Sequence, residues 1–233
     1  MPKWRTKRDV PHDGYDSAVL VDVIIRKTCR LRDLARIDDV LSGEQLLPTI
    51  AGVAAAGAVQ PLRVLDFGGA AGAHFLAAKA AFPARRMRWA VVETPSMAEA
   101  AAAKLGNDEL HFFTDIATAA AWLERVDLVH CDSALQYAQE PETTLDTLIG
   151  LAAPAMLWAR LMLADRRERF VQTSWLKDNG PGPLPDGIAD RAVSYSAIRL
   201  PRAAFLVAHE RAGYSLAWKA RDTDAFLFLH APR

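Results

Sequence analysis

The sequence predicts an α/β fold: a mostly parallel sheet of seven strands between helices, closed by a C-terminal β-hairpin and preceded by a helical cap. Three observations support this prediction. Apolar segments of strand length alternate with helical segments five times between residues 62 and 164, as expected for successive βαβ units. Several of these strands end on an acidic or polar residue. The last two strand segments are separated only by a short polar turn, which is typical of a hairpin.

The composition limits the kinds of partner. The 233 residues carry 28 basic and 28 acidic side chains, so no net field attracts nucleic acid or an anionic membrane. We therefore expect a small-molecule substrate, with neither a nucleic acid nor a membrane as partner. A chain of this length can form one large domain with a substantial core, and we expect a monomer or a homodimer.

The two cysteines, Cys29 and Cys131, lie far apart and lack the spacing of metal ligands. The sequence therefore predicts no metal site, no disulfide framework and a cytoplasmic location. The basic N-terminus is not followed by the apolar segment of a signal peptide. The most apolar stretch, residues 149–164, contains Pro154 and Arg160 and is too short to span a bilayer.

Residues 1–50 are predicted to form an arm and a helical cap, ahead of a ligand-binding domain over residues 51–233. Residues 1–13 look irregular, which favours a loosely attached arm. Apolar residues recur at helical spacing between residues 17 and 40, and residues 44–58 are apolar and alanine-rich, so amphipathic helices are expected here. This cap either covers the edge of the sheet or acts as a lid over the ligand, and the pattern fits both roles.

The first strand, which ends on Asp66, runs into a glycine-rich loop and then into a helix over residues 71–82. Gly68, Gly69 and Gly72 leave the backbone free to turn tightly and let a ligand come close. Their spacing differs from the fingerprint of nicotinamide dinucleotide sites. The loop is therefore predicted to cradle a different ligand.

The second strand, residues 87–93, also ends on a carboxylate. Glu93 follows Asp66 by 27 residues, a spacing that fits one βαβ unit. One ionised carboxylate can accept hydrogen bonds from both hydroxyls of a ribose, and folds of this kind hold the ribose at this strand end. We therefore predict that Glu93 binds the ribose of a nucleoside ligand.

The third and fourth strands end on polar groups as well. Asp115 follows the third strand and either reads an adenine amino group or caps the helix that begins at Ile116. Asp132 and Ser133 follow the fourth strand. The carboxyl ends of neighbouring parallel strands line one crevice, so these groups are expected to meet the two earlier carboxylates around one ligand.

The remaining residues complete the sheet. A fifth strand is expected over residues 155–164. Residues 165–195 are rich in glycine and proline and are predicted to form a long loop on the substrate side of the pocket. A helix over residues 201–212 and strands over residues 214–219 and 225–230 end the chain.

With these motifs the chain resembles the class I S-adenosylmethionine (SAM) dependent methyltransferases, and more narrowly a group of small bacterial methyltransferase-like proteins. The general resemblance covers roughly residues 50–233. The narrower one rests on short motifs at Gly14-Tyr15, residues 64–69, 91–93, 110–113 and 133–137, Asp165-Arg166 and Val171-Gln172. The sequence departs from the glycine motif of the family at Ala70, where a middle glycine would stand.

The resemblance implies a Rossmann-like class I methyltransferase fold, with SAM as the cofactor of the domain over residues 51–233. It assigns the methionine end of SAM to Asp66, Gly68 and Gly72, the ribose to Glu93, and the adenine to Asp115 with Ile116. The further expected cofactor contacts are Gly69, Asp132 and Ser133.

Few catalytic groups are needed, because the sulfonium of SAM is already a leaving group. Aromatic faces would stabilise this cation, and the candidates are Tyr15, Tyr137, Trp175 and Tyr195, of which the three tyrosines are the predicted catalytic residues. Each of these aromatics also fits a position in the core or at the rim. A general base could be His74, His130 or His209, and the sequence does not choose among them.

Three functions agree with these residues. The first is transfer of a methyl group to a small metabolite, a biosynthetic intermediate of secondary metabolism or a sugar. The second is cyclisation of SAM itself, in which its α-amine attacks its own γ-carbon to give azetidine-2-carboxylate and methylthioadenosine. The third is a non-catalytic SAM-binding protein, for which the departure at Ala70 is the only support.

Overall fold

The computed structural model describes residues 15–34, 43–221 and 223–230. The arm expected over residues 1–13 lies outside these ranges. Two helices, α1 (Ala18–Arg32) and α2 (Gly43–Ala55), come before the first strand of the sheet. Helix α1 lies inside the predicted range 17–40, and α2 begins one residue before the predicted range 44–58 and ends inside it. Residues 35–42 are also outside the described chain.

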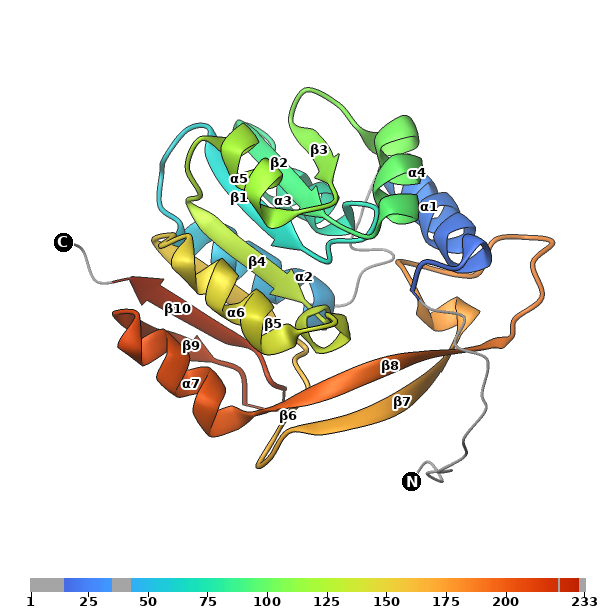
Figure 1. Cartoon of the computed structure of the whole chain (residues 1–233). Coiled ribbons are helices and arrows are strands. Elements are labelled where there is room, and N and C mark those ends of the chain that lie inside the picture. Colours follow the sequence, from blue (N-terminus) through green and yellow to red (C-terminus); the bar gives the residue numbers. More distant parts are fainter. Residues whose placement is uncertain (1–14, 35–42, 222, 231–233) are drawn as a thin grey trace.

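Seven strands form the main sheet, in the order β3-β2-β1-β4-β5-β10-β9 (Figure 1). Their bounds are Leu62–Phe67 for β1, Met87–Val92 for β2, Leu110–Phe113 for β3, Leu128–Asp132 for β4, Ala155–Ala159 for β5, Tyr214–Lys219 for β9 and Phe226–His230 for β10. The first five strands are parallel, and β10 runs antiparallel to both β5 and β9. The predicted fold, a mostly parallel seven-stranded sheet with a C-terminal hairpin, is confirmed.

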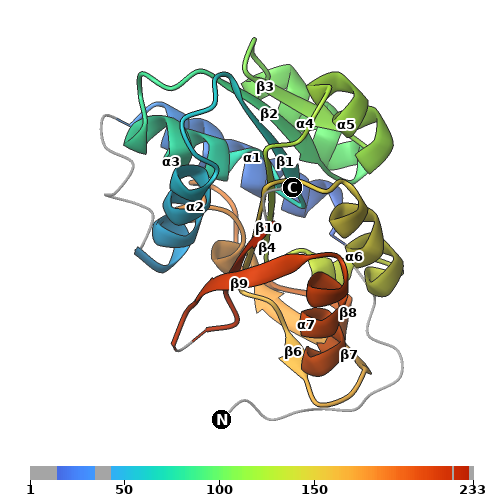
Figure 2. The same ribbon diagram turned by 90° about the vertical axis from the view of Figure 1, so that its left-hand side faces the viewer.

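Helices cover both faces of this sheet. The helices that follow the strands are α3 (Ala73–Ala81), α4 (Pro95–Leu105), α5 (Ile116–Leu123), α6 (Pro141–Gly150) and α7 (Arg202–Arg211). Helices α1 to α4 contribute to one buried cluster and α5 to α7 to the other, and Figure 2 shows α2 and α3 on the opposite side of the sheet from α5, α6 and α7. Every residue of β4 and β5 is buried, because parallel strands covered on both faces bury both sets of side chains.

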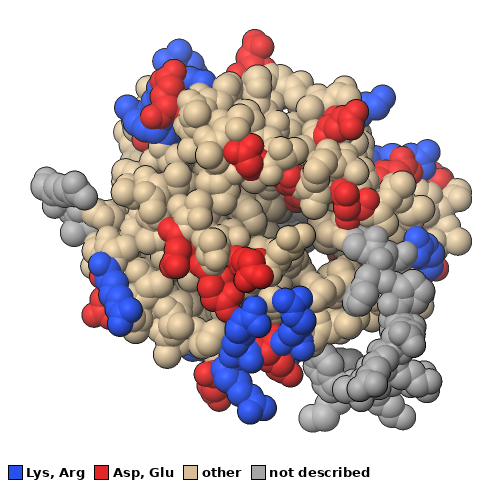
Figure 3. Space-filling model, viewed as in Figure 1, with Lys and Arg blue, Asp and Glu red and all other residues tan. Residues whose placement is uncertain are grey.

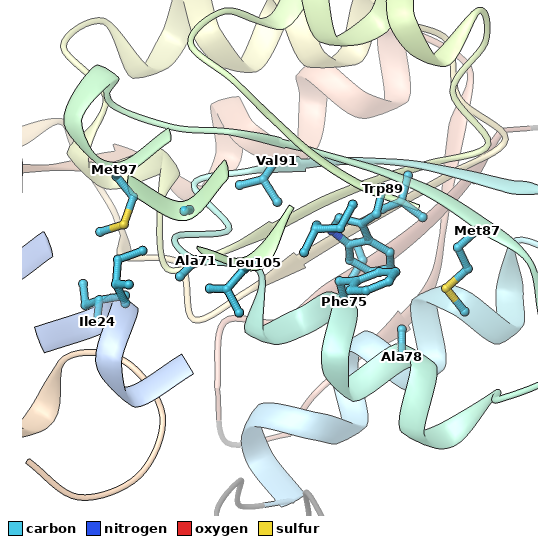
Figure 4. Close-up of a cluster of buried hydrophobic side chains, with 14 of the residues drawn as sticks. Ile24, Ala71, Phe75, Ala78, Met87, Trp89, Val91, Met97 and Leu105 are labelled. Atoms are coloured by element: carbon cyan, nitrogen blue, oxygen red, sulfur yellow. The ribbon is translucent and has the colours of Figure 1, made fainter. Parts of the chain in front are cut away.

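The core on the first face is built around Trp89 of β2 (Figure 4). Phe75 of α3 meets its indole ring edge-on, with 6.0 Å between the ring centroids. Ile24 of α1 and Met97 of α4 lie in the same cluster. The cap is therefore packed directly on the helices of the sheet layer, and the predicted division at residue 50 falls inside α2.

The structure differs from the sequence prediction between residues 160 and 200. The fifth strand ends at Ala159 and not at residue 164. The prediction of one long loop over residues 165–195 is wrong, because β7 (Glu168–Trp175) and the start of β8 (Ala192–Pro201) lie in this range. They form a second sheet together with β6 (Leu163–Ala164). Strands β7 and β8 pair antiparallel over eight residues. The segment between them begins with a short 3-10 helix, Leu176–Asp178, and continues as the expected loop with its glycines and prolines.

Charged side chains of both signs lie side by side on the face shown in Figure 3, as the balanced composition suggests. Within the described ranges, the structure contains no helix that is both long enough and apolar enough to cross a membrane.

Candidate functional site

A cavity of about 580 Å³ lies at the carboxyl ends of β1, β2, β4 and β5. In the sheet, β2 and β3 lie on one side of β1, and β4 and β5 lie on the other. The order of the strands therefore reverses between β1 and β4, and open α/β sheets bind ligands at such a switch point. The glycine loop forms one wall. Residues of α1, Tyr15 ahead of it, and the start of the loop over residues 176–191 form another.

The cap and this loop are joined by a buried lysine. Lys27 of α1 is 2% exposed, and its Nζ donates to the carbonyl oxygens of Lys177, at 2.8 Å, and Asn179, at 2.7 Å. Burial lowers the pKa of Lys27 to about 8. Asn179 itself lines the cavity, so the bonds of Lys27 fix the position of a wall of the site.

The glycine loop takes the backbone shape that its sequence requires. Gly68 has a φ of 70°, and a Cβ placed on it would come within 2.1 Å of the Cβ of Ala134. Ala70, which stands where the family has a glycine, also adopts a left-handed conformation with a φ of 49°. The N–H of Ala70 donates to Oε1 of Glu93 at 3.0 Å.

Glu93, just beyond the end of β2, lines the cavity. Its Oε1 accepts the N–H of Ala70, and its Oε2 accepts the N–H of Thr94 at 2.9 Å. Each oxygen has one lone pair left. Burial, opposed by these two N–H donors, raises the pKa of Glu93 to about 7. The carboxylate can therefore still accept two further hydrogen bonds from a ligand, one at each oxygen.

Asp66 is fully buried and does not line the cavity. Its Oδ1 lies 2.8 Å from Nδ1 of His130, and its Oδ2 accepts the indole N–H of Trp89 at 3.0 Å. Nδ1 of His74 is 3.5 Å from Oδ2. Burial alone would raise the pKa of Asp66, but the neighbouring imidazoles of His130 and His74 hold that pKa below its usual value. Asp66 thus lies beneath the glycine loop rather than in the cavity.

His74 links this buried carboxylate to a second one. Its Nε2 lies 3.2 Å from Oδ2 of Asp132, and Oδ1 of Asp132 accepts Nε of Arg160 at 2.6 Å. Burial lowers the pKa of His74, but the carboxylates of Asp66 and Asp132 raise it to about 10. At neutral pH His74 is therefore a cation between two anions.

The ligand atoms of Asp66, His74 and His130 lie within 4.8 Å of one another, a separation short enough for a metal ion. The second nitrogen of each histidine has its own partner, Asp132 for His74 and Thr49 for His130. Hydrogen bonds and ion pairs account for the cluster without an ion, except that Nδ1 of His74 makes no hydrogen bond.

Three tyrosines form an aromatic wall of the cavity. Tyr15 stacks on Tyr137 with 6.1 Å between centroids, and Tyr195 meets both rings edge-on at 5.8 and 5.2 Å. The hydroxyl of Tyr137 donates to Gln172 at 2.8 Å, and that of Tyr195 lies 2.9 Å from the hydroxyl of Ser174. The three predicted catalytic tyrosines are therefore together, although they come from three parts of the chain.

The other predicted residues divide into two groups. Gly68, Gly69, Asp132 and Ser133 line the cavity with Glu93, whereas Gly72, Ile116, His130, Trp175 and His209 do not. Asp115 is also outside the lining. Its side chain accepts the N–H of Thr118 at 2.8 Å and caps α5, so the capping alternative describes its observed contact.

Sequence reasoning missed several lining residues, above all Arg160, Gln172, Ser174 and Asn179. Arg160 directly follows β5, so the rule that identified Glu93 would have identified it too. Arg160 was missed because the strand was predicted to continue to residue 164. Gln172 and Ser174 lie on β7, which was expected to be loop.

No protein-family model and no curated protein matches the chain. Solved structures do match it. An O-methyltransferase family protein from Burkholderia thailandensis aligns over 93% of this chain at 15% identity with a TM-score of 0.53. The CcbJ methyltransferase from Streptomyces caelestis aligns over 91% of this chain and 99% of its own, at 15% identity and a TM-score of 0.51.

A third match is the SAM-bound amino pentose methyltransferase of calicheamicin biosynthesis from Micromonospora echinaspora. It covers 97% of this chain and 100% of its own, at 15% identity and a TM-score of 0.50. The chain spans only 62% of the Burkholderia protein. At such identities the likeness shows the fold alone, and that fold is the one of class I methyltransferases.

Proposed function

We propose that this chain binds SAM in the cavity and transfers a methyl group to a small-molecule acceptor. The observation that carries the proposal is the geometry of Glu93. Two backbone N–H groups fix its carboxylate just beyond the end of β2, one at each oxygen, and Glu93 lines the cavity with one lone pair left on each oxygen. A pair of adjacent ribose hydroxyls is the ligand group that matches two such acceptors.

The surroundings of Glu93 support the same ligand. The backbone of Gly68, Gly69 and Ala70 lines the cavity beside it, and the absence of side chains at the glycines lets a ligand approach the loop. Asp132 and Ser133 lie across the switch point at the end of β4. Asp66 is assigned a different role from the one expected: it holds His74 and His130 beneath the loop.

The chemistry asks little of the protein. Bound SAM supplies a methyl group on a sulfonium, whose bonding electrons return to sulfur as a nucleophile takes the methyl carbon. The chain must hold the acceptor in line with that carbon, and such orientation contributes on the order of 7–11 kcal/mol. The faces of Tyr15, Tyr137 and Tyr195 can stabilise a cation beside them by roughly 0.5–2 kcal/mol.

His74 is unsuited to remove the proton of the acceptor. Its pKa of about 10 keeps it protonated at neutral pH. An acceptor that is already an anion, or one that loses its proton to water, agrees with this site. A basic imidazole is therefore not part of the proposed mechanism.

The cyclisation of SAM remains as a second candidate because the tyrosine wall is in mutual ring contact. Three such rings occupy space that a bulky acceptor would need. A wall of packed rings suits a reaction in which SAM carries its own nucleophile.

One assay separates these functions. The purified protein is incubated with SAM alone and then with candidate acceptors, and the thioether product is identified. S-adenosylhomocysteine that forms only with an acceptor supports methyl transfer, whereas methylthioadenosine formed faster than in a protein-free control supports cyclisation. Binding without turnover leaves a non-catalytic SAM-binding protein.

The residue assignment has its own test. Glu93→Ala is expected to weaken SAM binding by roughly 1.5–3 kcal/mol, the range for hydrogen bonds to a charged group. Affinity is measured by titration calorimetry at a pH above 8, where the carboxylate is ionised. An unchanged affinity would remove Glu93 from the site.

A further inference from the structure

Arg160, the residue after β5, is held in an unusual conformation. Its φ is 48°, in the left-handed region that non-glycine residues rarely adopt. Nε2 of Gln136 donates to its backbone carbonyl at 3.2 Å. Strain of this kind persists where the surrounding structure imposes it and is concentrated at ligand sites. Here it sends the side chain into the cavity, whose lining includes Arg160.

The guanidinium of Arg160 makes a hydrogen bond to the described part of the chain through only one of its three nitrogens. Nε of Arg160 donates to Oδ1 of Asp132 at 2.6 Å, and the other oxygen of Asp132 lies 3.2 Å from the imidazole of His74. Among the residues that the structure describes, neither terminal nitrogen of Arg160 makes a hydrogen bond. Four of the five N–H donors of the guanidinium are thus free. The side chain is 44% exposed, and Arg160 lines the cavity.

The free N–H donors of Arg160 favour an anion at this corner of the cavity. The charges of Asp66 and Asp132 are balanced by the His74 cation and by Arg160, so the terminal N–H groups of Arg160 are left for a further acceptor. A planar fork with free terminal N–H groups matches a carboxylate, which it can bind through two parallel hydrogen bonds. Tyr15 and Tyr137 line the cavity beside it.

We propose that Arg160 is the centre of a carboxylate-binding subsite in this cavity. The inference rests on the proposed function, which supplies two possible sources of the bound carboxylate. One is the amino-acid tail of SAM, and the other is the acceptor. Asp132 and Gln136 are positioning residues: the first fixes the guanidinium through Nε, and the second fixes the backbone.

The first arm of the test asks whether the subsite exists. The protein is saturated with methylthioadenosine, which has the nucleoside of SAM but no carboxylate, and is titrated with benzoate and with its uncharged isostere benzamide. The wild type is expected to prefer benzoate. Arg160→Gln is expected to lower that preference by roughly 10- to 150-fold, the range for hydrogen bonds to a charged group, and Arg160→Lys is expected to fall between, because lysine keeps the charge but not the fork.

The second arm identifies the source of the carboxylate. The affinities for SAM and for methylthioadenosine are compared in wild type and Arg160→Gln. If the tail of SAM fills the subsite, Arg160→Gln lowers the affinity for SAM by a similar factor and leaves the affinity for methylthioadenosine unchanged. If the acceptor fills it, both affinities stay at the wild-type level while the preference for benzoate is lost.

Arg167 offers a matched control. Its Nε donates to Glu142 at 2.6 Å and its side chain is 43% exposed, nearly the same pairing and exposure as Arg160, but it is not in the cavity lining. Arg167→Gln should change neither preference. Thermal unfolding of every variant shows whether it is folded at the temperature of the titration.

The proposal is overturned if Arg160→Gln leaves both the benzoate preference and the ratio of SAM to methylthioadenosine affinity unchanged. It is equally overturned if that variant weakens SAM and methylthioadenosine by the same factor with no change in the benzoate preference, since Arg160 then only supports the fold of the site. Should the wild type bind neither nucleoside, the proposed function has failed. The benzoate titration is then run without nucleoside and decides the subsite alone.

Discussion

The titration of Glu93 leads to a prediction about stability that needs no ligand. Burial raises the pKa of this carboxyl from 4.5 to about 7 in the folded chain. A group whose pKa is raised on folding favours the folded state fully below its unfolded pKa, and that contribution is lost as the pH rises through the folded pKa. The cost of ionising Glu93 in the fold therefore appears between about pH 4.5 and pH 7.

The magnitude follows from the shift. Each unit of pKa shift corresponds to about 1.4 kcal/mol, so ionising Glu93 in the folded chain costs roughly 3 kcal/mol in total. About 2–3 kcal/mol of this cost develops between pH 5 and pH 8. Glu93→Gln cannot ionise. The free energy of unfolding of the wild type is therefore expected to fall relative to that of the variant by about 2–3 kcal/mol over this interval.

Urea denaturation followed by tryptophan fluorescence at several pH values measures this difference. Glu109→Gln is a suitable control, because Glu109 accepts the N–H of Met87 at the opposite end of β2 and does not line the cavity. A difference between wild type and Glu93→Gln that stays constant from pH 5 to pH 8 would refute the reasoning. The reasoning would also fail if the control variant showed the same change with pH.

Ligand binding should reverse the effect. Ribose hydroxyls that donate to the ionised carboxylate, and a cationic sulfonium nearby, both favour the charged form of Glu93. Binding of SAM at pH 7 is therefore expected to release part of one proton, measured by calorimetry in buffers with different enthalpies of ionisation. The affinity should fall as the pH drops below 7, and Glu93→Gln should remove both effects.

Three further predictions concern stability and the aromatic wall. Asp66→Asn is expected to destabilise the fold by about 3–5 kcal/mol in urea denaturation, because it removes a buried carboxylate that faces the His74 cation and bonds His130 and Trp89; a loss below 1 kcal/mol would contradict the buried network. Gly68→Ala should cost about 2 kcal/mol or more, since the φ of 70° and the approach to Ala134 both oppose a side chain, whereas Gly150→Ala, with open space around it, should not destabilise. Tyr137→Leu should weaken binding of SAM by about 0.5–2 kcal/mol and binding of the uncharged S-adenosylhomocysteine less, and equal losses would argue against a cation–π contribution.

Much of the fold could be predicted because its signals are local. Each βα unit has an apolar run, a turn and a helical segment in sequence, and Glu93 could be singled out because strand ends converge at one edge of a parallel sheet. The second sheet could not be predicted in the same way. Strand β7 exposes or half-exposes every residue, so it lacks the buried alternation that marks a strand, and its pairing with β8 spans a loop rich in glycine and proline.

The site shows the same limit. Asp66 was expected at the ligand because it stands at a strand end, but its environment depends on His130 of β4 and His74 of α3, which come near it only in the folded sheet. Periodicity cannot reveal which side of the glycine loop a carboxylate will occupy. Pairings between distant residues, such as Arg160 with Asp132, are likewise set by the tertiary fold.

A crystal structure of the chain with S-adenosylhomocysteine bound tests whether Glu93 holds the ribose. The two ribose hydroxyls are expected to lie within hydrogen-bond distance, about 2.5–3.0 Å, of the two carboxylate oxygens of Glu93, with the thioether sulfur over the ends of β1 and β4. A nucleoside bound outside this cavity, or a ribose that makes no contact with Glu93, would contradict the proposed binding mode.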